Sequence, residues 1–322
     1  MKFIIFGDSK GKDNGINKKV LNSLLKSSKK YAPSPDFIVI CGDSIAGSKD
    51  PKLLKLQLED FNSIINKHYP SAHILPVIGN HEVNINPTDD RFEKIFASIY
   101  DNMIPESNCL VEYNKTVYFL DFSNIRIIVL NSFHYGEIQK VSEIVLNWLK
   151  EITADCTKKK LLFIHSPLFP TGAHLGHCLD LYTANRDDLL VTIEECSIDA
   201  VFCGHEHNYS RRLINKTDNL KDLYQIIMFC HIIVLISCIG GSVSLIANYK
   251  IYIENKHYRA VVHELDATNQ VFLLVYFRSK DNPASENISN YQNESSERIL
   301  YNYSKAVECL KVNQVHILDF EK

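Results

Sequence analysis

The stretch FIIFGDSKG, residues 3–11, stands almost at the first residue of the chain and indicates the fold. Four apolar residues run into Gly7-Asp8, as a buried strand does when it ends at a carboxylate on the edge of a sheet. The pattern returns in VICGD (39–43), PVIGNHE (76–82), LLFIHSP (161–167) and AVFCGHEH (200–207). We therefore expect five strands that each deliver a ligand-type side chain to one sheet edge.

The segments between these runs predict helices that alternate with strands. Further apolar runs extend the set of expected strands to 2–7, 37–41, 74–78, 117–121, 125–130, 160–165 and 199–203. Helical spacing of apolar residues appears in 16–31, in 51–66 behind Pro51, in 138–150 and in 186–196. This alternation predicts an α/β sheet covered by helices, with more strands at 232–238, 259–264 and 270–276.

The 322 residues are enough for one large α/β unit, which we place at 1–278. Residues 279–322 are predicted to form a polar C-terminal extension, because 279–298 reads as a loop or tail segment. No internal repeat is found.

Charge and cysteine usage narrow the class of partner and the compartment. Against 38 Asp+Glu stand 35 Lys+Arg, so no basic field argues for nucleic acid or an anionic membrane surface. The nine cysteines are scattered without CxxC pairs, which is typical of reduced thiols. The strand-like run at residue 3 leaves no room for a signal peptide, and we expect a cytoplasmic protein.

Residues 226–247, IIMFCHIIVLISCIGGSVSLIA, have two interpretations. Their length reaches the roughly 20 apolar residues that span a bilayer, so a membrane anchor is the alternative. The internal Gly240-Gly241 pair and the many β-branched residues favour two buried strands joined at the glycines.

The side chains at the strand ends are typical of a metal site. Carboxyl ends of strands in an α/β sheet lie along one edge, so residues far apart in sequence converge there. Asp, Asn and His together suit Mg, Mn, Fe or Zn. Alone, a Gly-Asp pair is an ordinary turn and His165 an ordinary histidine, but Gly-His-x-His directs two imidazoles to one place. Five strand ends in this order favour one site over five accidents.

These motifs, in their order and spacing, resemble those of the calcineurin-like metallophosphoesterase superfamily over roughly residues 2–265. HNYSRR at 207–212 and the Gly240-Gly241 pair resemble its purple acid phosphatase-like branch. The resemblance implies a four-layer αββα sandwich with two mixed β-sheets and a dinuclear metal centre. Asp43 would bridge both ions, Asp8 and His207 would bind the first, and Asn80, His165 and His205 the second.

The implied chemistry is phosphoester hydrolysis. Two cations about 3.5–4 Å apart acidify a hydroxide held between them and clamp the phosphate oxygens. His81 would not bind metal but would protonate the leaving oxygen. Glu82 and Asp199 are expected to be structural. Weaker candidates for substrate contact are Lys10, Asn17, His174 and His177, although Asn17, with Asn14, also fits a turn and helix cap, and loop histidines are often surface residues.

The chain departs from the superfamily at the first metal. Position 10 is Lys where Asp-x-His is widespread, and position 46 is Ala where purple acid phosphatases have Tyr. We expect weaker ion binding there. An ammonium cannot coordinate a cation, so Lys10 is expected to turn away and either reach the substrate phosphate or pair with a carboxylate such as Asp13.

The sequence thus predicts a metal-dependent phosphoesterase acting on a phosphomonoester or phosphodiester of a small molecule or phosphoprotein. The alternative is a catalytically weak metal-binding or regulatory protein on the same fold. Two divalent ions are expected, and the ligand types do not discriminate among Mn, Zn, Fe and Mg. The sequence carries no signal for oligomeric state.

Overall fold

Strands that are apolar on both faces dictate the architecture. In Lys2–Phe6 (β1), Phe3 and Ile5 point to one side and Ile4 and Phe6 to the other, and all four are fully buried. Such a strand needs a covering layer on each side. The computed structural model describes residues 2–84, 89–171, 174–208, 210–214, 223–228, 233–239, 242–248, 258–266, 271–279 and 316–319.

The first sheet contains β1 near its centre. Its strand order is β15-β12-β11-β1-β3-β4, with β3 at Phe37–Ile40, β4 at His73–Pro76, β11 at Ile233–Ile239, β12 at Ser242–Asn248 and β15 at His316–Asp319. The β1, β3 and β4 strands are parallel, whereas β11, β12 and β15 join by antiparallel pairing. This sheet is therefore mixed.

The second sheet is mixed as well. Its order is β5-β6-β7-β8-β10-β9, with β5 at Tyr118–Phe122, β6 at Ile125–Val129, β7 at Lys159–Phe163, β8 at Ala200–Cys203, β10 at Tyr224–Ile227 and β9 at Ser210–Leu213. The four central strands are parallel, and β5 and β9 pair antiparallel at the edges. Two further strands, β13 (Tyr258–Asp266) and β14 (Val271–Ser279), pair as an antiparallel hairpin, and Lys10–Asp13 forms the short β2.

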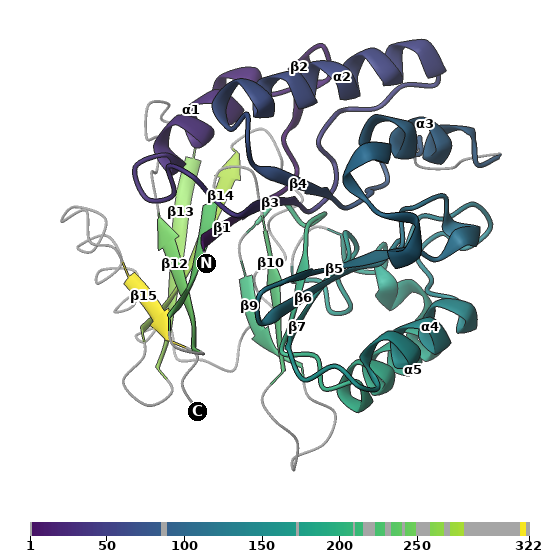
Figure 1. Cartoon of the computed structure of the whole chain (residues 1–322). Coiled ribbons are helices and arrows are strands. Elements are labelled where there is room, and N and C mark those ends of the chain that lie inside the picture. Colours follow the sequence, from purple (N-terminus) through teal and green to yellow (C-terminus); the bar gives the residue numbers. More distant parts are fainter. Residues whose placement is uncertain are drawn as a thin grey trace.

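Helices cover the outer face of each sheet (Figure 1). The first sheet packs against α1 (Lys18–Ser28), α2 (Pro51–His68) and α3 (Arg91–Tyr100), and the second against α4 (Glu143–Thr153) and α5 (Thr183–Glu195). Short 3-10 helices occupy Asp101–Met103, Glu106–Asn108, Val111–Tyr113 and Leu179–Tyr182. Between the sheets, Phe3, Phe37, Phe163 and Phe202 are among the buried core residues. The predicted four-layer αββα sandwich is confirmed.

Most predicted elements are present with small shifts at their ends. The α4 helix begins at Glu143 rather than at 138, and α5 begins at Thr183 rather than at 186. The sequence analysis missed α3, β2, β9, β10 and β15. Residues 279–298, predicted as loop or tail, lie outside the described residues apart from 279, and the boundary at 278/279 stays a prediction.

The stretch 226–247 forms strands wherever it is described. The β10 strand ends at Ile227, and β11 pairs antiparallel with β12 on the two sides of residues 240–241. The strand interpretation is therefore confirmed over these ranges. In the described part of the chain, none of the helices combines the length and the apolar character that a bilayer crossing requires.

A buried polar network ties α3 to the second sheet. Glu93 accepts hydrogen bonds from Thr116 Oγ1 (2.9 Å), Asn131 Nδ2 (3.3 Å) and His134 Nδ1 (2.9 Å). Asn131 and His134 follow β6, so the carboxylate joins a helix on one outer layer to a loop of the other sheet. Burial opposes protonation of His134, but its hydrogen bond to Glu93 and the nearby charges of Glu93, Glu137 and Asp90 together outweigh burial and raise the pKa of His134.

This pair predicts a pH-dependent contribution to stability. His134→Gln should lower the free energy of unfolding by about 1–3 kcal/mol in acid, because it removes a partly buried charged hydrogen bond. A histidine whose pKa is raised in the folded state contributes its full stabilisation below the unfolded-state pKa of about 6.5. This stabilisation is lost as pH rises through the folded-state pKa. Urea unfolding at pH about 5.5 and about 8.5 should therefore show the larger loss at the lower pH. His73→Gln on β4 is the control, and equal losses at both pH values would contradict the prediction.

Candidate metal centre

The predicted ligands gather where the strands of both sheets end. Backbone hydrogen bonds tie these loops in pairs: Asp8 N–H donates to Gly42 O (2.9 Å), and Gly204 N–H donates to His165 O (2.9 Å). The two sheets are joined by His165, whose Nδ1–H donates to the Cys41 carbonyl oxygen at 2.6 Å. Residues from the ends of β1, β3, β7 and β8 therefore share one buried site.

Glycines allow these loops to approach each other. A Cβ on Gly42 would lie 2.4 Å from His165 Nδ1, and one on Gly204 would lie 2.5 Å from the Cys41 carbonyl oxygen. Both distances are shorter than non-bonded atoms adopt, so neither position accepts a side chain without displacing backbone or His165. The glycines of the GD and GHEH motifs thus set the spacing between the sheets at the site.

Four predicted ligands lie in the left-handed backbone region. The φ angles are 55° at Asp8, 51° at Asp43, 73° at His205 and 52° at His207. Non-glycine residues seldom adopt this conformation, although Asp and His do so more often than most. Such strain persists where the surrounding structure over-determines it, and it clusters at functional sites.

Asp43 is the centre of the ligand set and is fully buried. Its Oδ1 accepts a hydrogen bond from His81 N–H (3.1 Å) and lies 3.3 Å from His165 Nε2. Its Oδ2 lies 2.6 Å from Lys10 Nζ and 3.8 Å from His81 Nε2. The two oxygens therefore face different partners.

Glu82 holds the Asp43 loop against the GNHE loop. Its carboxylate accepts from the backbone N–H groups of Asp43 (3.0 Å), Ser44 (2.8 Å) and Gly79 (2.9 Å) and from Ser44 Oγ (2.7 Å). Asp199 similarly accepts from Lys160 N–H (2.8 Å). The structural roles predicted for both residues are confirmed.

The ligand atoms form two groups that share Asp43. One group is Asp43, His165 and His205, the other is Asp8, Asp43 and His207, and within each group the ligand atoms lie within 4.8 Å of one another. Asp8 also accepts from His205 N–H (3.0 Å), and its Oδ1 lies 3.5 Å from His207 Nε2. The two groups contain the Asp and His members of the two ligand sets that the resemblance implies, and the assignment of an ion to each group stays a prediction.

Two buried ligand-type atoms among the described residues lack a hydrogen-bond partner, one on His205 of the second group and one on Asn80. Among the residues that the structure describes, Asn80 Oδ1 and His205 Nε2 are buried and make no hydrogen bond. Leaving a buried polar group unsatisfied costs about 1–3 kcal/mol, so such atoms call for a partner. An amide oxygen and an imidazole nitrogen are ligands for Zn, Mn, Fe and Mg, and the donor set therefore fits a divalent ion.

The candidate ligands differ in charge: two of the histidines are neutral, and Asp43 is an anion. Burial, with His165 nearby, lowers the pKa of His205 to about 2, and burial, with Lys10 nearby, lowers that of His207 to about 3. Burial opposes ionisation of Asp43, yet the charge and hydrogen bond of His165 hold its pKa well below the usual range. His205 and His207 are therefore neutral imidazoles, the form that binds metals, and Asp43 is an anion.

Burial and neighbouring charges favour the protonated forms of Asp8 and His165. Burial raises the pKa of Asp8 to about 8. Burial opposes the charge on His165, but Asp43 outweighs it and raises the pKa of His165 to about 9. Because ligands must be deprotonated, coordination by these two groups would release protons.

Of the two loop histidines, the structure places His174 at the site and His177 on the exposed surface. The ring centroid of His174 lies 4.4 Å from that of His205 and 5.8 Å from that of His207, so His174 lines the site. Its backbone N–H donates to Glu206 Oε1 (3.1 Å), which holds the loop in place. His177 is exposed, and no contact with the ligand set is found for it.

Asn17 and Asn14 serve the local structure. Asn17 is the N-cap of α1, where its Oδ1 accepts from Val20 N–H (3.3 Å). Asn14 Nδ2 donates to Asp60 Oδ2 (2.9 Å). The cap interpretation is therefore confirmed, and the substrate role of Asn17 stays an untested prediction.

Lys10 pairs with a carboxylate, as one of its two predicted roles requires, but the partner is Asp43 instead of Asp13. We expected its side chain to turn away from the first metal position, towards substrate or a carboxylate such as Asp13, but its ammonium lies 2.6 Å from Asp43 Oδ2. The Lys10 backbone N–H donates to Asp43 O (3.2 Å), which holds the residue beside this carboxylate. A buried anion strongly favours the nearest cation, and the exposed Asp13 offers less.

Two residues around the site were missed. The Phe133 ring lies 5.7 Å from the His165 ring and 6.2 Å from the His205 ring and walls the site. Phe133 follows the apolar run 125–130, which ends in polar residues as the other strands do. This pattern could have been used to predict that the loop after 130 lies at the site. Glu206, between the two predicted histidines, was assigned no role.

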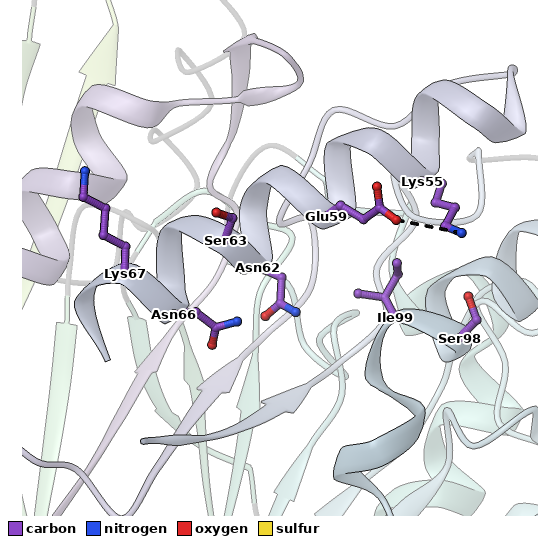
Figure 2. Close-up of a pocket in the computed structure, with 8 residues that line it drawn as sticks. All are labelled: Lys55, Glu59, Asn62, Ser63, Asn66, Lys67, Ser98 and Ile99. Atoms are coloured by element: carbon purple, nitrogen blue, oxygen red, sulfur yellow. Dashed lines mark ion pairs between the residues drawn. The ribbon is translucent and has the colours of Figure 1, made fainter. Parts of the chain in front are cut away.

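A polar groove elsewhere has no link to these residues. It lies between α2 and α3 (Figure 2), and its lining comprises Lys55, Glu59, Asn62, Ser63, Asn66, Lys67, Ser98 and Ile99. None of the predicted site residues takes part in it.

Known proteins resemble this chain in sequence and in fold. The family model for calcineurin-like phosphoesterase matches residues 1–209. Serine/threonine-protein phosphatase CPPED1 of Danio rerio is 25% identical over 206 residues, which are 62% of this chain and 63% of that protein. The chain thus spans less than two thirds of that relative.

Two solved structures share the fold. A dimetal phosphatase from Danio rerio has a TM-score of 0.59 at 15% identity, over 78% of this chain and 96% of that one. The purple acid phosphatase PPD1 of yellow lupin has a TM-score of 0.57 at 15% identity, over 78% of this chain and 51% of that one. At these identities the likeness bears on the fold alone.

The unsatisfied atoms predict which substitutions lower metal content. Asn80→Ala and His205→Ala should each weaken binding of a divalent ion at least tenfold, because each removes a ligand that other groups cannot replace. Elemental analysis after dialysis against Mn²⁺ or Zn²⁺ measures the ion content, and the shift in melting temperature with added ion measures its binding. His73→Ala, on β4 outside the site, is the matched control. An unchanged ion content in both site variants would remove these residues from the ligand set.

Proposed function

The chain belongs to the calcineurin-like phosphoesterase family, a family of hydrolases of phosphoric ester bonds, and from this we propose that it is a metal-dependent phosphoesterase with a dinuclear centre. The sharing of Asp43 by two ligand groups carries the proposal. The first ion would be held by Asp8, Asp43 and His207, and the second by Asp43, Asn80, His165 and His205. The substrate would be a phosphomonoester or phosphodiester.

The protein residues supply binding and charge. Divalent ions bound there would acidify water and neutralise phosphate oxygens. An anionic carboxylate placed between two cation positions lowers their mutual repulsion, and Asp43 is such a group. The neutral His205 and His207 bring nitrogen lone pairs without adding positive charge.

His81 is oriented for proton transfer. Its Nδ1 lies 2.7 Å from the Ala46 carbonyl oxygen, which only accepts, so Nδ1 carries a proton. Its Nε2 faces Asp43 Oδ2 at 3.8 Å, and the side chain is 22% exposed. With Nδ1 protonated, Nε2 can donate only from the imidazolium form of His81, so we assign this form as the acid that would protonate the leaving oxygen from Nε2, which faces both the ligand set and solvent.

We propose that His174 contacts the substrate. The ring of His174 lies over His205 and His207, where it would hydrogen-bond a substrate phosphate.

Because the Danio rerio relative is named a serine/threonine-protein phosphatase, phosphoserine and phosphothreonine peptides are the first macromolecular substrates to test. The six cysteines whose side chains are described are free, which supports a cytoplasmic location.

A catalytically weak metal-binding regulator is the second candidate. The contact between Lys10 and Asp43 favours it, because an ammonium takes up one oxygen of the shared carboxylate. Intact His81 and the complete second group favour the enzyme.

Chelation tests the proposed function. Removal of divalent ions should abolish hydrolysis of p-nitrophenyl phosphate, bis-p-nitrophenyl phosphate or a phosphopeptide, and Mn, Zn, Fe or Mg should restore it, since every proposed ligand is an oxygen or imidazole nitrogen. Wild-type protein should recover and Asn80→Ala should not. Full activity in protein shown by elemental analysis to be free of metal would refute the proposal.

His81→Ala should separate proton transfer from ion binding. Ion content should stay near the wild-type value, while turnover falls by about 100- to 10,000-fold for alkyl phosphates and by less for p-nitrophenyl phosphate, whose leaving group needs no proton. Steady-state kinetics on both substrates measure this. His73→Ala is again the control. Equal losses on both substrates would assign His81 a positioning role instead.

A further inference from the structure

Lys10 brings a positive charge to one half of the ligand set. Its Nζ lies 2.6 Å from Asp43 Oδ2, and its side chain is 20% exposed whereas that of Asp43 is fully buried. The other oxygen, Oδ1, faces His165 Nε2 at 3.3 Å. The ammonium is therefore placed on one oxygen of the shared carboxylate, and the second group has the other.

The backbone holds Lys10 in this place. Its own N–H donates to Asp43 O (3.2 Å), Gly11 N–H donates to Gly15 O (3.0 Å), and Ser9 Oγ donates to Ser44 O (3.0 Å). Lys10 is thus anchored on both sides, at the first residue of β2. A long surface side chain that met the carboxylate by chance would lack these anchors.

An ammonium and a metal ion compete for the position beside Asp43 Oδ2. Lysine has three donors and no lone pair, so it cannot act as a ligand beside the ion. At an effective dielectric constant of about 20, a unit charge about 4 Å away changes a cation's binding constant by about 100-fold or more. The Asp8, Asp43 and His207 group carries this penalty most directly.

We propose that the Lys10 ammonium takes the charge position of the first ion. The centre then binds one ion tightly at Asp43, Asn80, His165 and His205, and binds the other only when the ammonium leaves Asp43 Oδ2. This inference rests on the proposed function, because it requires the same ligand set to bind ions. Its consequence is a centre whose two ions differ in affinity by at least tenfold.

Titration of metal-free, full-length protein with Mn²⁺ tests the inference. Calorimetry gives both affinities, and low-temperature electron paramagnetic resonance distinguishes isolated Mn²⁺ from exchange-coupled pairs. Wild type should bind one ion tightly and give the signal of isolated Mn²⁺ at one equivalent. Lys10→Met should tighten the weaker ion at least tenfold and by a clearly larger factor than the tighter ion, whose ligand group uses the other oxygen of Asp43. Lys10→Arg, which keeps the charge, should retain the weak site.

Lys12→Met is the matched control. Lys12 is exposed on the same strand, and its substitution removes the same charge from the chain. Equal tightening by Lys12→Met would overturn the inference, as would two ions of similar affinity in wild type. If Lys10→Met fails to fold by circular dichroism, coupled pairs in wild type at one equivalent would still overturn it. Absence of ion binding in wild type and in folded Lys10→Met would instead refute the proposed function.

Discussion

A carboxylate that is wholly buried is tolerated only when positive charge and hydrogen-bond donors surround it, and Asp43 is under this constraint. Its partners come from both sheets: Lys10 and the His81 N–H from loops of the first, and His165 from the end of β7 in the second. The loops of the site are arranged around this one anion. Without it, the two ligand groups would lose their common member and His165 would lose the partner that keeps it charged.

The sequence predicted the fold, and the convergence of the candidate ligands, because both depend on the same local pattern. An apolar run that ends in Gly-Asp or Gly-His places its last side chain at the edge of a sheet, and parallel strands bring those edges together. The buried ends of β1, β3, β7 and β8 needed no further information. Their convergence follows from topology alone.

Side-chain direction in the loops was not predictable in the same way. His174 and His177 are the same residue type three positions apart, and a hydrogen bond from the His174 backbone to Glu206 holds His174 at the site. Lys10 was expected to avoid a cation position, but the backbone bond to Asp43 places it beside the anion. In both cases a contact between residues far apart in the sequence determines where the side chain lies, and the spacing of residues in the sequence does not predict that contact.

The left-handed backbone at Asp8, Asp43, His205 and His207 bears on how this chain tolerates change. Each such residue costs of order 1–3 kcal/mol, and glycine would relieve most of that cost. Glycine would therefore relieve backbone strain at these positions, but at Asp43 it would also leave Lys10 and the buried His165 without their anion. Selection for thermal stability alone would thus act differently on the four positions: it would retain Asp43 for the fold, and a stabilised descendant could keep the sandwich while it loses candidate ligands at the other three.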